Sequence, residues 1–138
     1  MADAVTSQTL SDGDRIAVVK FTKISDGTGE SSVEKVDISA LAASNAGLTP
    51  ALATIEQIWY DVGGMRVALE WNATTNVVAA VLGGSAAAGP GSGYMDFRSF
   101  GGLKNTLASG YDGDIDLTTS GHTNLDHYTI VLQLRKSY

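Results

Sequence analysis

The sequence predicts an all-β protein, a single-domain antiparallel β-sandwich or barrel of about eight short strands. Two observations lead to this fold class. Apolar and polar residues alternate with a period of two in several segments, most clearly in residues 65–71 and 127–136. Sixteen glycines and only two prolines indicate many turns between these segments. Short strands separated by glycine turns are typical of a sandwich or barrel rather than of a βαβ fold.

Residues 55–71 are the stretch around which we expect the core to form. Two alternating arms meet at Gly63 and Gly64, and a Gly-Gly pair supplies the positive φ that a tight hairpin turn needs. Both tryptophans, Trp59 and Trp71, lie in this stretch. We therefore expect a central β-hairpin.

The remaining elements follow in chain order. Residues 1–14 are small and polar, and they form either a frayed tail or an ordered arm. Residues 15–138 form the single β domain, with further strands expected at 15–23, 33–38, 77–82, 94–100, 114–119 and 127–136. We expect the strands at 15–23 and 33–38 to pair as a hairpin. Residues 83–93 are expected to be a Gly/Ala-rich loop.

Aromatic residues provide the candidate contact positions. Trp59 shares a strand face with Gln57 and Asp61. We expect a second sheet to cover this face, and the alternative is an exposed tryptophan suited to protein or glycan contact. The possible partner-contact residues of the chain are Trp59, Tyr94, Phe97 and Phe100.

Composition excludes several functional classes. The formal net charge is −6 with scattered basic residues, which disfavours nucleic-acid binding because phosphate contact needs clustered Lys and Arg. The absence of cysteine excludes disulfides and thiol chemistry. The N-terminus lacks the features of a secretory signal, and no apolar run approaches the length of a membrane span.

An acidic run suggests a metal site without meeting a known signature. Asp112, Asp114 and Asp116 are spaced at i, i+2 and i+4, and calcium favours such oxygen ligands. The EF-hand signature fails, because Leu117 and Thr123 occupy the positions of its glycine and glutamate. We expect a turn followed by an exposed strand face, and a looser calcium site is the alternative.

The histidines and hydroxyls offer little further chemistry. His122, Asp126 and His127 lie close in sequence, a set that is compatible with a metal site, although a loop residue and a strand-edge residue are the simpler interpretation. No G-x-S-x-G nucleophile elbow and no phosphate-binding loop occur. We expect no catalytic residue, no cofactor and no enzymatic activity.

Four segments resemble small structural proteins of tailed bacteriophages. They are DGDRIAVVKFTKISDGTGESSVEKVDISAL (12–41), IWYDVGGMRVALEWNATTNVV (58–78), YMDFRSFGGLKN (94–105) and GDIDLTTSGHTNLDHYTIVLQLRKSY (113–138). The resemblance lies in the overall pattern rather than in a mechanistic motif. It implies a virion protein that is made in the host cytoplasm, assembles in many copies and carries no catalytic residues.

Within this class, we expect a decoration (cement) protein on the capsid exterior that binds the major capsid protein, because net negative charge keeps the chain off packaged DNA and favours an outer surface. A neck or tail component is the alternative. A carbohydrate-binding module is the alternative from a different class, with Trp59, Trp71 or Tyr94 as a sugar platform. We further expect a homo-oligomer without nucleic-acid or membrane partners, and removal of residues 1–14 to weaken assembly more than folding.

Overall fold

The structure, a computed structural model, describes residues 4–83, 91–107 and 109–138. These residues form two short 3₁₀ turns, η1 (Ile38–Ala40) and η3 (Arg98–Phe100). The strands are β1 (Ala4–Asp12), β2 (Ile16–Asp26), β3 (Val33–Val36), β4 (Leu52–Gly63), β5 (Arg66–Ala73), β6 (Val77–Gly83), β7 (Gly91–Asp96), β8 (Tyr111–Ser120) and β9 (Asn124–Ser137).

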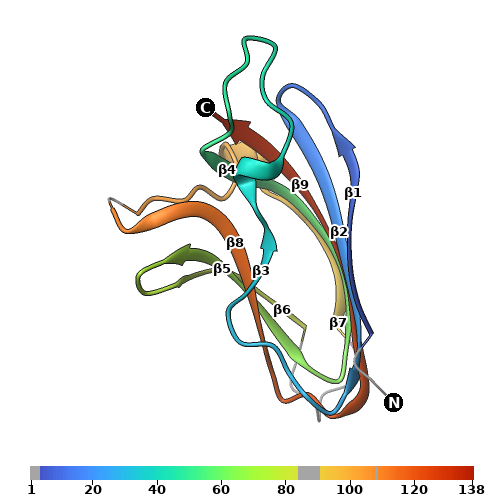
Figure 1. Ribbon diagram of the computed structural model, residues 1–138. Helices are drawn as coiled ribbons and strands as arrows, with labels where there is room; N and C mark the ends of the chain where they lie inside the picture. The colour runs from blue at the N-terminus through green and yellow to red at the C-terminus, as the bar shows by residue number, and fades with distance from the viewer. Residues whose placement is uncertain (1–3, 84–90, 108) are drawn as a thin grey trace.

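The strands form a β-sandwich of two antiparallel sheets, which confirms the predicted fold class (Figure 1). One sheet has five strands in the order β1–β2–β9–β4–β7, and the other has four in the order β3–β8–β5–β6. The described residues thus contain nine strands. The ninth is β1, which lies in the N-terminal segment where no strand is expected from the sequence. Within these residues, no helix has the length and apolar character of a membrane span.

The core lies between the inner faces of the two sheets. Alternation of buried and outward residues along β2, β5 and β9 shows how the period-two pattern of the sequence produces this layer. The largest fully buried apolar side chains are Phe21, Ile38, Ile55, Ile58, Met65, Leu69, Leu82, Ile115, Leu117, Tyr128 and Ile130. Trp71 is also buried here, with an exposed fraction of 5%.

The predicted hairpin at Gly63 and Gly64 is wrong, because β4 and β5 belong to different sheets. The expected positive φ is present at Gly64, with a value of 81°. The chain nevertheless passes from one sheet to the other at this turn, since β4 pairs with β7 and β9 while β5 pairs with β6 and β8. A tight glycine turn therefore connects strands of two different sheets here, although the same kind of turn also closes hairpins.

The expected hairpin of residues 15–23 and 33–38 is also wrong. β2 pairs with β1 and β9, whereas β3 pairs with β8 in the opposite sheet. The segment between β2 and β3 is held against β8 by Glu30. Its carbonyl accepts a hydrogen bond from the Thr119 N–H, and its N–H donates one to the Thr119 hydroxyl. Local turn residues do not encode such contacts between segments that are distant in sequence.

Three further segments differ in extent from the expected elements. The strand expected at 94–100 ends at Asp96, and residues 98–100 form η3 instead. Residues 4–12 of the N-terminal segment form the edge strand β1, paired along its length with β2. Of the expected loop at 83–93, residue 83 closes β6 and residues 91–93 open β7, while residues 84–90 lie outside the described residues.

Candidate functional site

The outer face of the five-stranded sheet carries the first candidate site. β4 turns Trp59 away from the core, and Val131 of β9 and Lys20 of β2 continue the same row across the sheet. Trp59 keeps an exposed fraction of 38%. The expectation that a second sheet covers this face is therefore wrong, because the four-stranded sheet packs on the opposite face, where Ile58 and Val62 are buried.

Trp59 and Tyr94 stack on each other on this face. The two residues are directly opposite in the β4–β7 register, their ring centroids are 5.2 Å apart, and their planes differ by 27°. Gln57, two residues before Trp59, donates a side-chain hydrogen bond to the Tyr94 hydroxyl. We call Gln57, Trp59 and Tyr94 the aromatic platform.

The two rings of the platform are stacked rather than side by side in one plane. Two rings that lie flat and side by side cannot bring their centres to 5.2 Å, because their edges would overlap. Neither ring covers the other, since Tyr94 is 48% exposed and Trp59 is 38% exposed. We infer that the pair presents ring edges and the two outer ring faces, and that the hydrogen bond from Gln57 holds Tyr94 in this position.

An ion pair borders the platform. Asp96 of β7 lies opposite Gln57 and accepts two hydrogen bonds from the Arg98 guanidinium, from Nε at 2.9 Å and from Nη2 at 2.7 Å. The side-chain and backbone hydrogen bonds from Arg98 hold the pKa of Asp96 well below its usual range. Both side chains are exposed, so this surface ion pair adds little to stability.

The other two predicted contact residues form a separate pair. Phe97 and Phe100 have ring centroids 6.0 Å apart at an interplanar angle of 60°. Phe97 packs partly against the core, whereas Phe100 is 64% exposed. The structure thus brings Trp59 together with Tyr94, and it places Phe97 with Phe100 beyond the end of β7.

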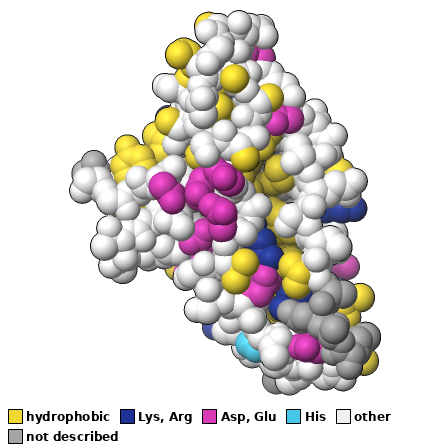
Figure 2. Space-filling view, viewed as in Figure 1, with side chains coloured by type: hydrophobic (Ala, Val, Ile, Leu, Met, Phe, Trp, Pro, Cys, Tyr) yellow, Lys and Arg dark blue, Asp and Glu magenta, His cyan; other side chains and the backbone are white. Residues whose placement is uncertain are grey.

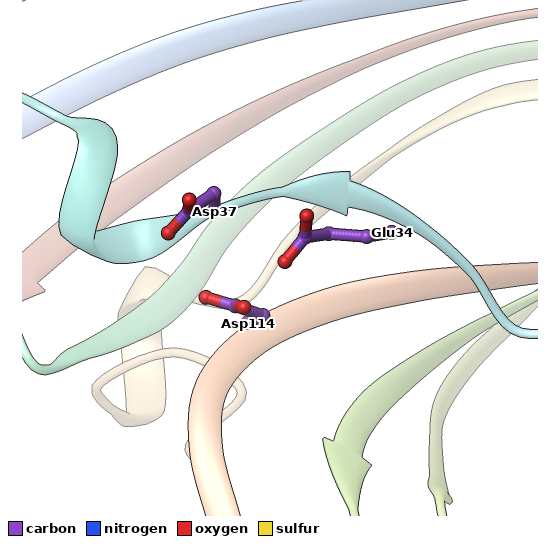
Figure 3. Close-up of side chains that lie close together, drawn as sticks. All are labelled: Glu34, Asp37 and Asp114. Atoms are coloured by element: carbon purple, nitrogen blue, oxygen red, sulfur yellow. The ribbon is translucent and has the colours of Figure 1, made fainter.

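The outer face of the four-stranded sheet carries a second candidate site, an acidic one. Glu34, Asp37 and Asp114 each place a carboxylate oxygen within 4.8 Å of the others. Figure 2 shows acidic side chains gathered over the β3–β8 region, and Figure 3 shows the three side chains pointing toward one another. β3 provides Glu34, the residue before η1 is Asp37, and β8 provides Asp114. We call these three residues the carboxylate cluster.

Asp114 is the buried member of the carboxylate cluster, with an exposed fraction of 8%. Its Oδ1 accepts a hydrogen bond from the backbone N–H of Ile38 at 2.9 Å. Burial is the largest cause that raises the pKa of Asp114 to about 7, followed by its hydrogen bond with the Glu34 side chain. The charges of Asp112 and Glu34 act in the same direction.

Asp116 lies two residues further along the same face of β8, opposite Glu34 in the register. It is 2% exposed, and its Oδ2 accepts hydrogen bonds from Asn72 and Asn76, both at 2.9 Å. Its Oδ1 is buried without a hydrogen-bond partner among the described residues. The expectation of an exposed strand face is therefore wrong at Asp114 and Asp116, because neighbouring polar side chains cover both.

The histidine set does not form a metal site in the described residues. Asp126 instead accepts hydrogen bonds from the backbone N–H and the hydroxyl of Thr123. His122 contacts the Thr119 hydroxyl through Nδ1 at 3.5 Å, and His127 is exposed. Within residues 4–83, 91–107 and 109–138, the convergent set of metal-binding side chains is the carboxylate cluster.

Comparisons with known proteins show distant likenesses of fold. No family model matches the chain, and no curated protein matches it. A mutant of a family 29 carbohydrate-binding module is 7% identical, with coverage of 96% of this chain and 92% of that one and a TM-score of 0.38. A virus-like particle protein of the extra small virus of the giant freshwater prawn Macrobrachium rosenbergii is 13% identical, with coverage of 97% and 80% and a TM-score of 0.29. A family 4 carbohydrate-binding module has a TM-score of 0.30 at 10% identity, with coverage of 96% and 94%.

Proposed function

We propose that the protein is a non-enzymatic structural protein of a virus particle, a decoration protein that binds the capsid exterior through the aromatic platform. The observation that carries this proposal is the exposed, stacked pair of Trp59 and Tyr94 on the outer sheet face. The resemblance to structural proteins of tailed bacteriophages supplies the setting, in which the partner is the major capsid protein.

The platform has the properties of a protein-contact site. Tryptophan and tyrosine are enriched among residues that dominate binding energy, because they bury a large area at a small cost in side-chain entropy. Stacking and the hydrogen bond from Gln57 order the pair before binding, which lowers that cost further. Many copies on a symmetric shell make a modest contact sufficient.

The net charge of the chain favours a location on the exterior of the particle. A net charge of −6 opposes contact with packaged DNA, whose phosphates are also negative. A neck or tail component remains the alternative within the same class. It differs from a decoration protein in copy number and in location on the particle.

A carbohydrate-binding module is the competing class. Sugar rings stack on the flat faces of aromatic side chains, and Trp59 and Tyr94, which each use one face for the other ring, keep their outer faces for such a contact. Binding on a glycan array that disappears in Trp59→Ala would move the protein to this class. We expect the array to show no binding.

The direct test is the binding of purified protein to particles from which it has been stripped. Trp59→Ala and Tyr94→Ala should each weaken binding about tenfold or more. Tyr111→Ala is the matched control, because Tyr111 is an exposed aromatic residue of β8, in the other sheet. Unchanged binding of both platform variants, with thermal unfolding like the wild type, would overturn the proposal.

A further inference from the structure

One end of the five-stranded sheet holds a pocket that shares no residue with the aromatic platform or the carboxylate cluster. There the turn between β1 and β2, the loop that follows η1 and the end of β9 lie close together (Figure 1). The pocket has a volume of about 310 Å³, which is at the lower end of the range for small-molecule sites. All three segments line it, and Arg15, Leu48 and Tyr138 are among the lining residues.

Hydrogen bonds hold the walls of this pocket in place. Asp14 Oδ1 accepts a hydrogen bond from the Asn45 backbone N–H at 2.7 Å, which ties the loop after η1 to the β1–β2 turn. Within the loop, the Leu48 N–H donates to Ser44 Oγ at 3.0 Å. The Tyr138 hydroxyl donates to the Asp14 carbonyl. A ligand therefore meets walls that are already joined to one another, which lowers the cost of binding.

Arg15 is the lining cation that lacks an acidic partner. Lys136 Nζ lies 2.5 Å from Asp12 Oδ1, and Arg135 Nη1 donates to Glu56 Oε2 at 3.2 Å. The exposed Arg15 side chain, in contrast, makes no ion pair or hydrogen bond in the part of the chain that the structure describes. One guanidinium thus remains available at the wall of the pocket.

The lining chemistry selects the kind of ligand. A guanidinium binds a carboxylate through two parallel hydrogen bonds. Leu48 is 57% exposed and Tyr138 is 42% exposed, so the same pocket offers apolar surface for a short stem. Asp14 also lines the pocket, and its negative charge repels a second charge on the ligand. A singly charged carboxylate therefore fits better than a phosphate dianion.

We propose that this pocket binds a carboxylate on a short apolar stem, with Arg15 as the partner of the carboxylate and Leu48 and Tyr138 in contact with the stem. A small free carboxylic acid and the glutamate side chain of a polypeptide carry this same group. The pocket lies apart from Trp59 and Tyr94, so the proposal does not depend on the proposed function.

The test is a titration of the ¹⁵N-labelled full chain at constant ionic strength, followed by two-dimensional NMR. The probes are sodium butyrate, as the free acid, and N-acetylglutamate amide, as the side chain of a polypeptide. We expect saturable shifts of the backbone amides of Arg15, Leu48 and residues 135–138. Binding of both probes, or of one alone, supports the site and identifies the source it accepts. N-acetylglutamine amide and inorganic phosphate should bind much more weakly.

Arg15→Ala should weaken binding of the carboxylate about tenfold or more, because the charged hydrogen bonds are lost. Arg15→Lys should bind with intermediate affinity, since it keeps the charge without the planar fork. Arg66→Ala is the matched control, because Arg66 is an exposed arginine of β5, in the other sheet. It should titrate like the wild type.

The proposal is overturned if neither carboxylate gives a saturable shift, or if Arg15→Ala binds as the wild type does. It is equally overturned if the neutral amide or phosphate binds as tightly as the carboxylates. Trp59→Ala should leave the titration unchanged, so failure of this site and failure of the aromatic platform are separate results.

Discussion

Glu30 is the residue that joins the two sheets through buried charge. Its Oε2 lies 2.5 Å from the Lys35 ammonium, and its Oε1 lies 4.0 Å from that of Lys23. The Tyr128 hydroxyl donates a hydrogen bond to Oε1 at 2.6 Å. Both lysine side chains are almost fully buried, and Glu30 makes its close ion pair with Lys35.

Replacement of Glu30 by Gln should lower the free energy of unfolding by about 3–5 kcal/mol, because it leaves the buried Lys35 ammonium facing a neutral amide. Urea denaturation measures this loss. Asp61→Asn, at an exposed carboxylate, should change stability by less than about 0.5 kcal/mol. Similar stabilities for the two variants would show that Glu30 has no such role.

Asp114 should make the stability of the protein depend on pH. Its pKa rises from 3.8 to about 7 on folding, so the folded state keeps a proton that the unfolded chain loses between these values. The contribution of this group to stability is therefore fully present below the lower value and is lost as the pH rises through the higher one.

The wild type should gain stability relative to Asp114→Asn when the pH falls from 8 to about 5. Thermal unfolding of both proteins at several pH values measures the difference. Asp61→Asn serves as the reference, since its difference from the wild type should not follow this curve. A constant difference between the wild type and Asp114→Asn would contradict the assignment.

At the scale of single residues, the sequence separates strand faces but not their surroundings. Alternation around Trp59 correctly groups it with Gln57 and Asp61, yet only the sheet packing decides that this face is open. The acidic run marks Asp114 as a candidate ligand, whereas it does not include Glu34 or Asp37. They lie more than seventy positions earlier, and no local pattern marks residues that meet through sheet pairing.

β1 is an element that adds to the sheet without adding to the core. None of the buried hydrophobic residues of the core comes from β1. The C-terminal end of β1, in contrast, is anchored to the rest of the protein. Asp12 Oδ1 lies 2.5 Å from the buried Lys136 ammonium, and Asp14, just beyond the strand, accepts a hydrogen bond from the Asn45 backbone. The anchoring side chains thus lie at and beyond the C-terminal end of the strand.

A chain that lacks residues 1–11 should therefore fold cooperatively, and a chain that lacks residues 1–14 should be less stable by about 3 kcal/mol, since Lys136 then loses its carboxylate. Urea denaturation of the two truncated proteins measures this difference. Equal stabilities would contradict the role of Asp12. Binding of both proteins to stripped particles tests whether β1 also contributes to assembly.

At the scale of elements, strand existence was predictable and strand pairing was not. Period-two alternation in residues 65–71 and 127–136 corresponds to β5 and β9, within a few residues at their ends. The sequence does not distinguish a hairpin from a crossover at Gly63–Gly64, because a tight turn has the same backbone requirements in both. The choice between them depends on contacts with β7, β8 and β9, which are distant in sequence.

At the scale of the whole molecule, the sandwich presents two chemically different outer faces. The five-stranded sheet carries the aromatic platform, and the four-stranded sheet carries the carboxylate cluster. A protein that sits on a shell needs one face for its support, while the opposite face remains available to solvent and ions.

The most direct test is cryo-electron microscopy of purified particles, with the copy number measured by quantitative gel densitometry. We predict many copies on the capsid exterior, with Trp59 and Tyr94 in contact with capsid subunits. A small number of copies in a ring or stack would instead indicate a neck or tail component. Absence of the protein from the particles, or a platform that faces solvent, would contradict the proposed function.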